Sequence, residues 1–143
     1  MAARPFTNVI SILQKAGLRP TRQRMGLARL LFEAGNRHVT AEELYEEASV
    51  ASIPVSLATV YNTLHQFTAS GLLREVIVEP GRAYFDTNTS GHHHFFFEES
   101  GDICDIPENE ISIARLPSLP DGSSLSRVDV VVRVTGGTVR EEK

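Results

Sequence analysis

The segment "VSLATVYNTLHQFTASG", residues 55–71, constrains the fold of this chain more than any other stretch. Ser56 can cap a helix and Gly71 can end one, so the segment predicts a single helix between them. Apolar residues recur at spacings of three and four, which predicts one buried face. They are Leu57, Val60, Leu64 and Phe67. The opposite face has no acid, and its hydrogen-bonding groups have the size that reads base edges. These groups belong to Thr59, Asn62, Thr63 and Gln66, with Tyr61 on the flank.

Three more helices are expected ahead of this one. The first covers roughly residues 6–16. The second begins near Thr21 and ends at Gly35. The third begins at a capping box formed by Thr40 and Glu43. Its residues expected to face the core are Leu44, Tyr45 and Ala48.

Two short strands are predicted in "LLREVIVEPGRAYFD", residues 72–86, with a turn at Pro80 and Gly81. Helices followed by a hairpin that carries Arg74 and Arg82 give the outline of a winged helix-turn-helix. An ordinary small helical domain is the alternative interpretation of this pattern.

The second half of the chain has a different character. "GHHHFFFE" and "GDICDI" are typical of successive strands, and "SRVDVVVRVTG" alternates like a strand buried on one face. A short helix is expected after Pro107. A small unit of this kind has exposed edges and a slim core, so it would gain from pairing with a second copy. The predicted fold class is α+β, with a winged-helix domain over residues 1–85 and a small α/β domain over 86–143.

Charge is divided unevenly between the two halves. Residues 1–85 hold nine Lys or Arg against seven Asp or Glu, whereas residues 86–143 hold five against eleven. Six basic residues precede the first acid, Glu33. A basic run is often only a solvated helix face. The asymmetry is nonetheless what we expect if the first half meets phosphate and the second half does something else.

The composition excludes several classes of site and location. No apolar run approaches the roughly 20 residues that a membrane span needs. The amino-terminal stretch has no hydrophobic signal core, which predicts a cytoplasmic protein without a membrane partner. The single cysteine, Cys104, excludes an internal disulfide and a zinc site built from paired cysteines.

Four stretches of the chain together resemble the ferric uptake regulator superfamily. They are "AGLRPTRQR", "HVTAEELYEEA", "ATVYNTLHQFTASGLL" and the histidine cluster followed by a Gly-Asp strand, in matching order over about residues 8–135. Within the superfamily they look most like the rhizobial iron response regulators, which sense haem. The resemblance implies a homodimer whose residues 1–85 bind operator DNA. Residues 86–143 would form the metal- or haem-sensing dimerisation domain.

The resemblance also implies which residues carry function. A hinge metal site would use His38, Asp86, His92, His94 and Asp105, in a spacing similar to that of the peroxide-sensing branch. Three imidazoles and two carboxylates suit Fe²⁺, Mn²⁺ or Zn²⁺ alike. DNA would be gripped at phosphates or in the minor groove by Lys15, Arg19, Arg22 and Arg24. The major groove would be read by Thr59, Tyr61 and Asn62. Tyr61 could instead pack between helices, and His65 is expected to be a partly buried structural histidine.

Departures from the family pattern remove one site and alter another. The superfamily often holds structural zinc through two Cys-x-x-Cys pairs, but Phe97 and Ser100 stand where the first pair would be, and the second pair is absent. We therefore expect no cysteine-ligated structural zinc, with phenylalanine packing in its place. Asn62 replaces the arginine that follows the family's tyrosine. Since asparagine can pair with adenine, a different operator is expected.

Two ligands compete for the histidine triplet. In one interpretation His92 and His94 help to hold a divalent ion. In the other, His92, His93 and His94 ligate haem iron through imidazole nitrogen, although no Cys-Pro haem-regulatory dipeptide is present. A surface histidine run without any ligand is the third possibility.

The preferred hypothesis is a dimeric transcriptional regulator, mainly a repressor, of iron and haem homeostasis genes. Haem or metal at the hinge would set its affinity for operator DNA. The alternative within the same class is a manganese, iron or peroxide sensor without a haem response. The remote alternative is a small histidine–carboxylate metalloenzyme, for which the basic first 32 residues would have no purpose. We expect no enzymatic activity.

Overall fold

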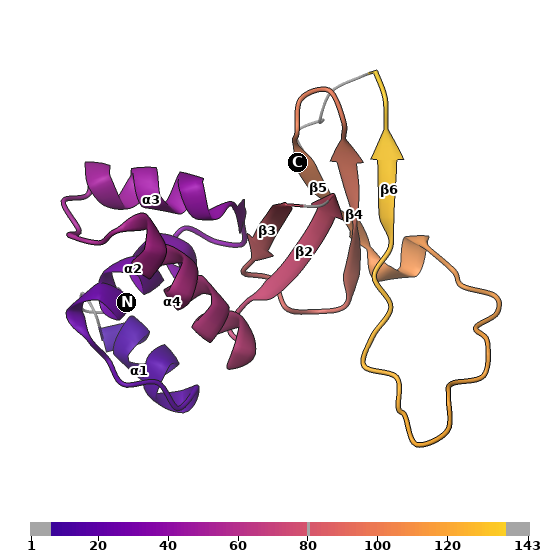
Figure 1. Cartoon of the computed structure of the whole chain (residues 1–143), viewed down its shortest axis with the longest axis horizontal. Coiled ribbons are helices and arrows are strands. Elements are labelled where there is room, and N and C mark those ends of the chain that lie inside the picture. The colour runs from indigo at the N-terminus through magenta and orange to yellow at the C-terminus, as the bar shows by residue number, and fades with distance from the viewer. Residues whose placement is uncertain (1–6, 80, 137–143) are drawn as a thin grey trace. The chain divides into compact units, whose positions relative to one another are not determined.

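The computed structural model describes residues 7–79 and 81–136 and divides into two compact units (Figure 1). Unit 1 runs up to Thr89, and unit 2 begins at Ser90. The boundary predicted from sequence lies four residues earlier, between residues 85 and 86. Pro80, in the predicted wing turn, lies outside the described residues.

Unit 1 contains helices and a three-stranded sheet in the order of a winged helix. The helices are α1 (Thr7–Lys15), α2 (Arg22–Phe32), α3 (Ala41–Val50) and α4 (Leu57–Ala69). The strands are β1 (His38–Val39), β2 (Arg74–Glu79) and β3 (Arg82–Asp86), in the sheet order β1-β3-β2. The α+β class and the winged helix-turn-helix are therefore confirmed, and β1 is a strand that the sequence analysis did not predict.

Side-chain caps place the helix starts where the sequence predicts them. The Thr21 hydroxyl accepts a hydrogen bond from the Arg24 amide at 3.2 Å. Thr40 and Glu43 form the full capping box, with bonds of 3.1 and 2.9 Å. Each cap satisfies an amide that the first turn leaves unpaired, and its loss typically costs about 1 kcal/mol. The starts of α2 and α3 are thus determined locally.

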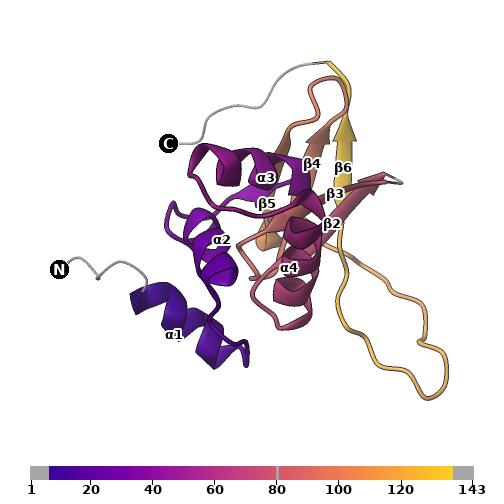
Figure 2. The same ribbon diagram turned by 60° about the vertical axis from the view of Figure 1, so that its left-hand side comes forward.

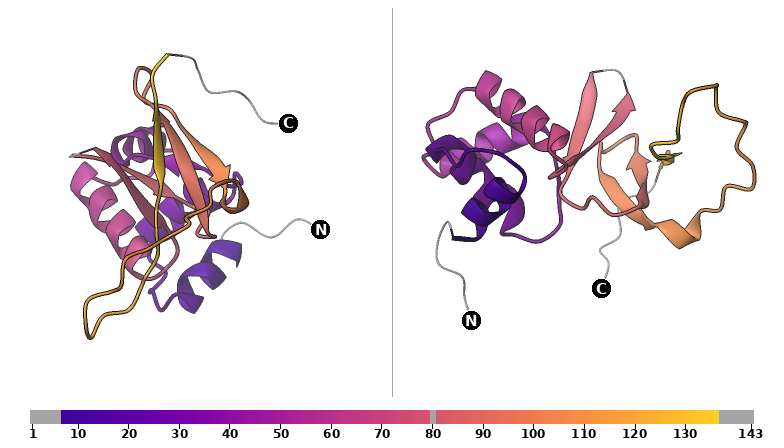
Figure 3. Two further views of the ribbon diagram at one scale, coloured as in Figure 1. Left: turned by 90° about the vertical axis from the view of Figure 1, so that its right-hand side faces the viewer. Right: turned by 90° about the horizontal axis from the view of Figure 1, so that it is seen from below.

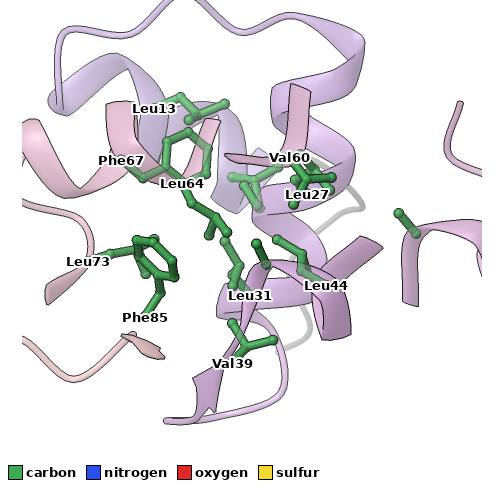
Figure 4. Close-up of a cluster of buried hydrophobic side chains, with 14 residues drawn as sticks. Leu13, Leu27, Leu31, Val39, Leu44, Val60, Leu64, Phe67, Leu73 and Phe85 are labelled. Atoms are coloured by element: carbon green, nitrogen blue, oxygen red, sulfur yellow. The ribbon is translucent and has the colours of Figure 1, made fainter. Parts of the chain in front are cut away.

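The core of unit 1 is formed by all four helices together with β1 and β3 (Figure 4). The side chains of α4 that enter it include Val60, Leu64 and Phe67, as predicted. Thr63 was expected on the outer polar face but is only 4% exposed. The reason is helical geometry, because a residue three positions after Val60 lies on the same face.

Tyr45 was expected in the core but is 36% exposed. Its neighbour Leu44 is fully buried, and consecutive helical residues differ by about 100° in direction. Ala41, Leu44 and Ala48 form the buried face of α3 instead. The prediction was therefore correct for Leu44 and Ala48 and wrong for Tyr45, which lies at the edge of the buried face of α3.

Unit 2 contains a second three-stranded sheet. Its strands are β4 (His92–Phe97), β5 (Ile103–Pro107) and β6 (Val131–Val134), in the order β5-β4-β6. β5 runs antiparallel to β4, and β6 lies parallel to β4 on its other side (Figure 2). β5 returns the chain to the end of the sheet at which β4 begins, and residues 108–130 then lead from β5 into β6.

The helix predicted after Pro107 is confined to a single 3-10 turn, Glu108–Glu110. Residues 111–130 contain no helix or strand and form the wide loop in Figure 3. β-Branched Ile111 and Ile113 are weak helix formers, and Pro117 and Pro120 cannot continue a helix. Local propensity therefore accounts for the correction.

Replacing Phe67 with Ala should destabilise unit 1 by about 3–5 kcal/mol, because it opens a cavity at a fully buried aromatic residue. Urea unfolding followed by far-ultraviolet circular dichroism measures the change, since every described α-helix belongs to unit 1. Ile77→Ala is the control, because Ile77 is 65% exposed and should cost less than about 0.5 kcal/mol. Equal losses in both variants would contradict the described core.

Candidate metal centre and nucleic-acid interface

Strand β4 separates the histidine triplet by alternation. Side chains of a strand point to opposite faces in turn, so His92 and His94 share one face and His93 lies on the other. All three imidazoles are buried. In the antiparallel pairing with β5, Asp105 is the direct partner of His94. The cross-strand register therefore brings one carboxylate to the pair of histidines.

The distances in this cluster are those of a metal site. Nε2 of His92 lies 3.3 Å from Oδ1 of Asp105, and Nε2 of His94 lies 3.5 Å from the same oxygen. The two imidazole rings are 4.6 Å apart between centroids. Ligand atoms that share one ion at about 2.0–2.2 Å lie roughly 3–4 Å from one another. The three residues therefore fit the donor set of a divalent transition metal.

A hydrogen bond selects the tautomer of the neutral His92 ring. Its Nδ1 lies 2.7 Å from the carbonyl oxygen of Ser90, which can only accept, so Nδ1 carries the proton. In the neutral ring Nε2 is then an unprotonated acceptor. It faces another acceptor, the Asp105 carboxylate, and two such lone pairs repel unless a cation lies between them. A metal ion or a second proton on the ring satisfies both groups.

His93 has a different task from its neighbours. Its Nδ1 accepts a hydrogen bond of 3.1 Å from the amide of Val130, the residue before β6. This bond secures the parallel strand to β4. The structure thus assigns His93 a structural contact on the face away from His92 and His94.

A second histidine–carboxylate pair lies in unit 1. His38 of β1 is the register partner of Asp86 of β3, with His38 Nε2 3.1 Å from Asp86 Oδ2. Asp86 is fully buried, and its Oδ1 accepts the amide of Asn88 at 2.9 Å. The buried Arg74 stands opposite Asp86 in β2. A buried carboxylate requires positive charge nearby, so the pair can serve as ligands or as a structural ion pair.

On α4, Tyr61 is partly exposed, and its side chain is fixed by a residue of α3. Its hydroxyl donates to Oε2 of Glu42 at 2.7 Å, and this hydrogen bond raises the pKa of the phenol above its ordinary value. The Tyr61 ring stacks on His65, whose edge meets Phe85. His65 is exposed rather than partly buried as expected. Tyr61 therefore stands at the surface and does not pack between helices.

The basic residues predicted to meet DNA lie at the ends of α1 and α2. Lys15 ends α1, and Arg19 and Arg22 are exposed. Arg24 is half-buried and donates to the Arg19 carbonyl at 2.8 Å and to Oε1 of Gln66 at 3.1 Å. On α4, Asn62 is exposed, whereas Thr59 is half-buried with its hydroxyl bonded to Ser56 at 3.0 Å.

Two participants were missed by sequence reasoning. Glu42 and the Ser90 carbonyl carry no local signal of their roles, because each is defined by a neighbour that folding supplies. Gln66 was predicted to lie on the polar face of α4, but its partner Arg24 could not be predicted from that position.

Within residues 7–79 and 81–136, no helix has the length and hydropathy needed to cross a membrane.

Comparison with known proteins gives a consistent picture. Residues 15–126 match the family described as "Ferric uptake regulator family". The "Ferric uptake regulation protein" of Pseudomonas aeruginosa is 38% identical over 102 residues, 71% of this chain and 76% of the relative. The "Peroxide-responsive repressor PerR" of Staphylococcus epidermidis is 38% identical over 97 residues, 68% of this chain and 64% of the relative.

Solved structures share the fold. The ferric uptake regulator of P. aeruginosa with manganese superposes with a TM-score of 0.69 at 29% identity, covering 88% of this chain and 96% of that one. A zinc-bound manganese uptake regulator gives a TM-score of 0.63 at 20% identity, covering 93% of this chain and 99% of that one, and shows likeness of fold alone.

Replacing His94 with Ala should weaken Mn²⁺ or Zn²⁺ binding by on the order of 100-fold, since even a second-shell partner is worth 10–100-fold. Asp105→Asn should also weaken it, because the carboxylate loses its charge. Isothermal titration calorimetry measures both affinities. His65→Ala, an exposed histidine outside the cluster, should bind like the wild type. Undiminished binding in the His94 variant would contradict the site.

Proposed function

Because this chain belongs to the ferric uptake regulator family, we propose that it is a metal-responsive, sequence-specific DNA-binding regulator of transcription. We further propose that it acts mainly as a repressor of iron and haem homeostasis genes. The observation that carries the proposal is the cluster formed by the buried imidazoles of His92 and His94 with the Asp105 carboxylate, whose spacing fits the ligands of a divalent ion. The names of the relatives describe a regulation protein and a repressor, which supports a regulatory role.

The exposed side of α4 supports the DNA-binding part of the proposal. Tyr61 and Asn62 stand at the surface, and Asn62 lines a hollow together with Arg19 and Arg24 near the start of α2. In the winged-helix arrangement the second helix of the turn enters the major groove. Tyr61 and Asn62 would contact bases there, with Lys15, Arg19 and Arg22 on the backbone. Thr59 would act at the rim of this surface.

The metal part of the proposal involves two residues of unit 1 and three residues of unit 2. We propose that His38 and Asp86 of unit 1 share one ion with His92, His94 and Asp105 of unit 2. Asp86 and His92 are six positions apart, which is at most about 20 Å of extended chain. Both carboxylates and the His92 ring are already oriented by hydrogen bonds or strand register. An ion shared in this way would couple the DNA-binding unit to unit 2.

The ligand set accepts Fe²⁺, Mn²⁺ or Zn²⁺, because imidazole and carboxylate suit all three. Mn²⁺ is the first ion to test, since the similar P. aeruginosa structure contains manganese. Phe97 and Ser100 offer no thiolate, so the proposed site does not include a cysteine-ligated structural zinc.

Haem is the second candidate effector. The supporting observation is that two buried imidazoles, His92 and His94, share one strand face with Phe96 in the same alternation. His93 would be excluded from haem ligation by its bond to Val130 unless that bond breaks. The resemblance to the iron response regulators implies that haem would loosen DNA binding.

We also propose that the regulator acts as a homodimer in the cytoplasm. Unit 2 exposes Ile113, Leu116, Leu119 and Leu125 along residues 111–130. Burying these side chains against a second copy would remove apolar surface from water.

Replacing Tyr61 and Asn62 together with Ala should weaken binding to a selected operator by at least tenfold, and binding to random DNA much less. Base contacts supply specificity, whereas phosphate contacts serve both DNAs. Fluorescence anisotropy at fixed salt measures both affinities. Equal losses on operator and random DNA would remove α4 from the reading role.

Adding Mn²⁺ should tighten operator binding, because the shared ion would couple the two units. Adding haem should release the operator, because haem would compete for the same histidines. A His92→Ala/His94→Ala variant should lose both responses while retaining the unfolding midpoint of unit 1. Anisotropy with either effector or a chelator tests this. If haem has no effect while Mn²⁺ or the chelator controls binding, the protein is an ion sensor and the haem proposal fails.

A further inference from the structure

A polar hollow of about 400 Å³ lies between the start of α2 and the exposed side of α4. Water occupies about 30 Å³ in the liquid, so the hollow can hold a phosphate group with its nearest waters. Every lining side chain has a hydrogen-bond donor, and none is a carboxylate. They are Arg19, Thr21, Gln23, Arg24, Thr59, Asn62, Thr63 and Gln66.

The hollow is electrostatically suited to an anion. Arg19, Arg22 and Arg24 make no ion pair with a carboxylate in the part of the chain that the structure describes. The first turn of α2 contains no acid, so no side chain offsets the positive end of this 11-residue helix. A helix start of this kind attracts phosphate, although by itself it does not define a site.

Thr63 provides an independent sign of a ligand. The side chain is 4% exposed and lines the hollow, yet its hydroxyl makes no hydrogen bond among the described residues. By contrast, the Thr68 hydroxyl one turn later donates to the Leu64 carbonyl at 2.8 Å. The hydroxyl therefore keeps its donor for an acceptor bound in the hollow that it lines.

Arg24 determines the orientation of a second donor. A guanidinium can only donate, so the Gln66 atom 3.1 Å away must be the carbonyl oxygen Oε1. The Gln66 NH₂ group then points away from Arg24 and remains available as a donor. Gln23 differs, because its NH₂ group donates to the Pro54 carbonyl at 3.0 Å. The Gln66 side chain can therefore donate a hydrogen bond to an acceptor, but its carbonyl oxygen is not available for a bidentate contact with a base.

We propose that this hollow binds one phosphate group of the DNA backbone. Arg19, the amides at the start of α2, the Thr63 hydroxyl and the Gln66 NH₂ group would hold the phosphate oxygens. Arg24 is a positioning residue that ties the α1–α2 connection to α4, instead of the direct phosphate contact expected from sequence. The inference rests on the proposed DNA-binding function and adds how α4 is registered on the duplex, since backbone contacts fix orientation.

Thr63→Val should weaken operator and random DNA binding by the same factor, about tenfold, because a hydrogen bond to a charged oxygen is lost from both. Valine has nearly the same shape, so α4 should remain folded. Thr68→Val on the same helix is the matched control and should leave both affinities unchanged. A loss confined to operator DNA would make Thr63 a base reader and overturn the proposal.

The salt dependence of DNA binding distinguishes Arg19, which would contact the phosphate, from Arg24, which would position α4 against the α1–α2 connection. Arg19→Ala should reduce the slope of log affinity against log salt by about 0.9, the value for one phosphate contact. Arg24→Lys keeps the charge but cannot reach both of its partners, so affinity should fall while the slope stays unchanged. An Arg24→Lys variant with wild-type affinity would overturn the positioning role.

The phosphate itself is identified with operator duplexes that carry a single neutral methylphosphonate. One position should weaken wild-type binding but have no further effect on Thr63→Val. Full additivity at every position would overturn the proposal.

A titration with inorganic phosphate at constant ionic strength tests free phosphate as the ligand. The NMR signals of Thr63 and Gln66 report binding. Saturation below about 1 mM would assign the hollow to free phosphate and overturn the DNA role.

These outcomes distinguish the site from the function. If the wild type prefers its operator while Thr63→Val and Arg24→Lys behave like it, the phosphate site fails and the regulator stands. If the wild type shows no operator preference, the regulator function fails, and the backbone role of the hollow fails with it.

Discussion

The burial of α4 against the core of unit 1 is the interaction on which the proposed DNA-binding surface depends. Val60, Leu64 and Phe67 are fully buried, and they fix the rotation of the helix about its axis. Once that rotation is set, Tyr61 and Asn62 must face outward. Each fully buried apolar side chain contributes roughly 1.5–3 kcal/mol relative to exposure, which is ample to hold one rotation.

The same rotation explains the polar hollow. Thr63 falls on the buried stripe and still borders the hollow beside α2, so its hydroxyl faces the hollow and makes no hydrogen bond among the described residues. Arg24 spans this gap and bonds to both sides, which keeps the arginine-rich connection against the helix. Packing and the proposed phosphate contact are therefore linked through the same residues, Thr63 and Arg24.

Unit 2 depends on a different constraint, which is the register of β4 with β5. A slip of one residue would turn His92 and His94 to the opposite face and bring His93 to Asp105. The hydrogen bond from the Val130 amide to His93 opposes such a slip, because it holds the His93 ring on the face away from Asp105. The three neighbouring histidines thus have two roles, two as potential ligands and one as a structural tie.

Much of this architecture could be read from the chain itself, because its signals are local. Capping residues and helical spacing determined the starts of α2, α3 and α4, the buried stripe of α4 and the winged-helix class. Strand alternation along "HHH" is enough to place His92 and His94 on one face. Only the tertiary structure decided what depends on contacts between distant segments. The partners of His94, Tyr61 and Gln66 lie 11, 19 and 42 positions away, and the short strand β1 exists only because it pairs with β3. Propensity acts within a turn or a strand, whereas a hydrogen bond between remote residues becomes defined when the core has fixed both of their backbones.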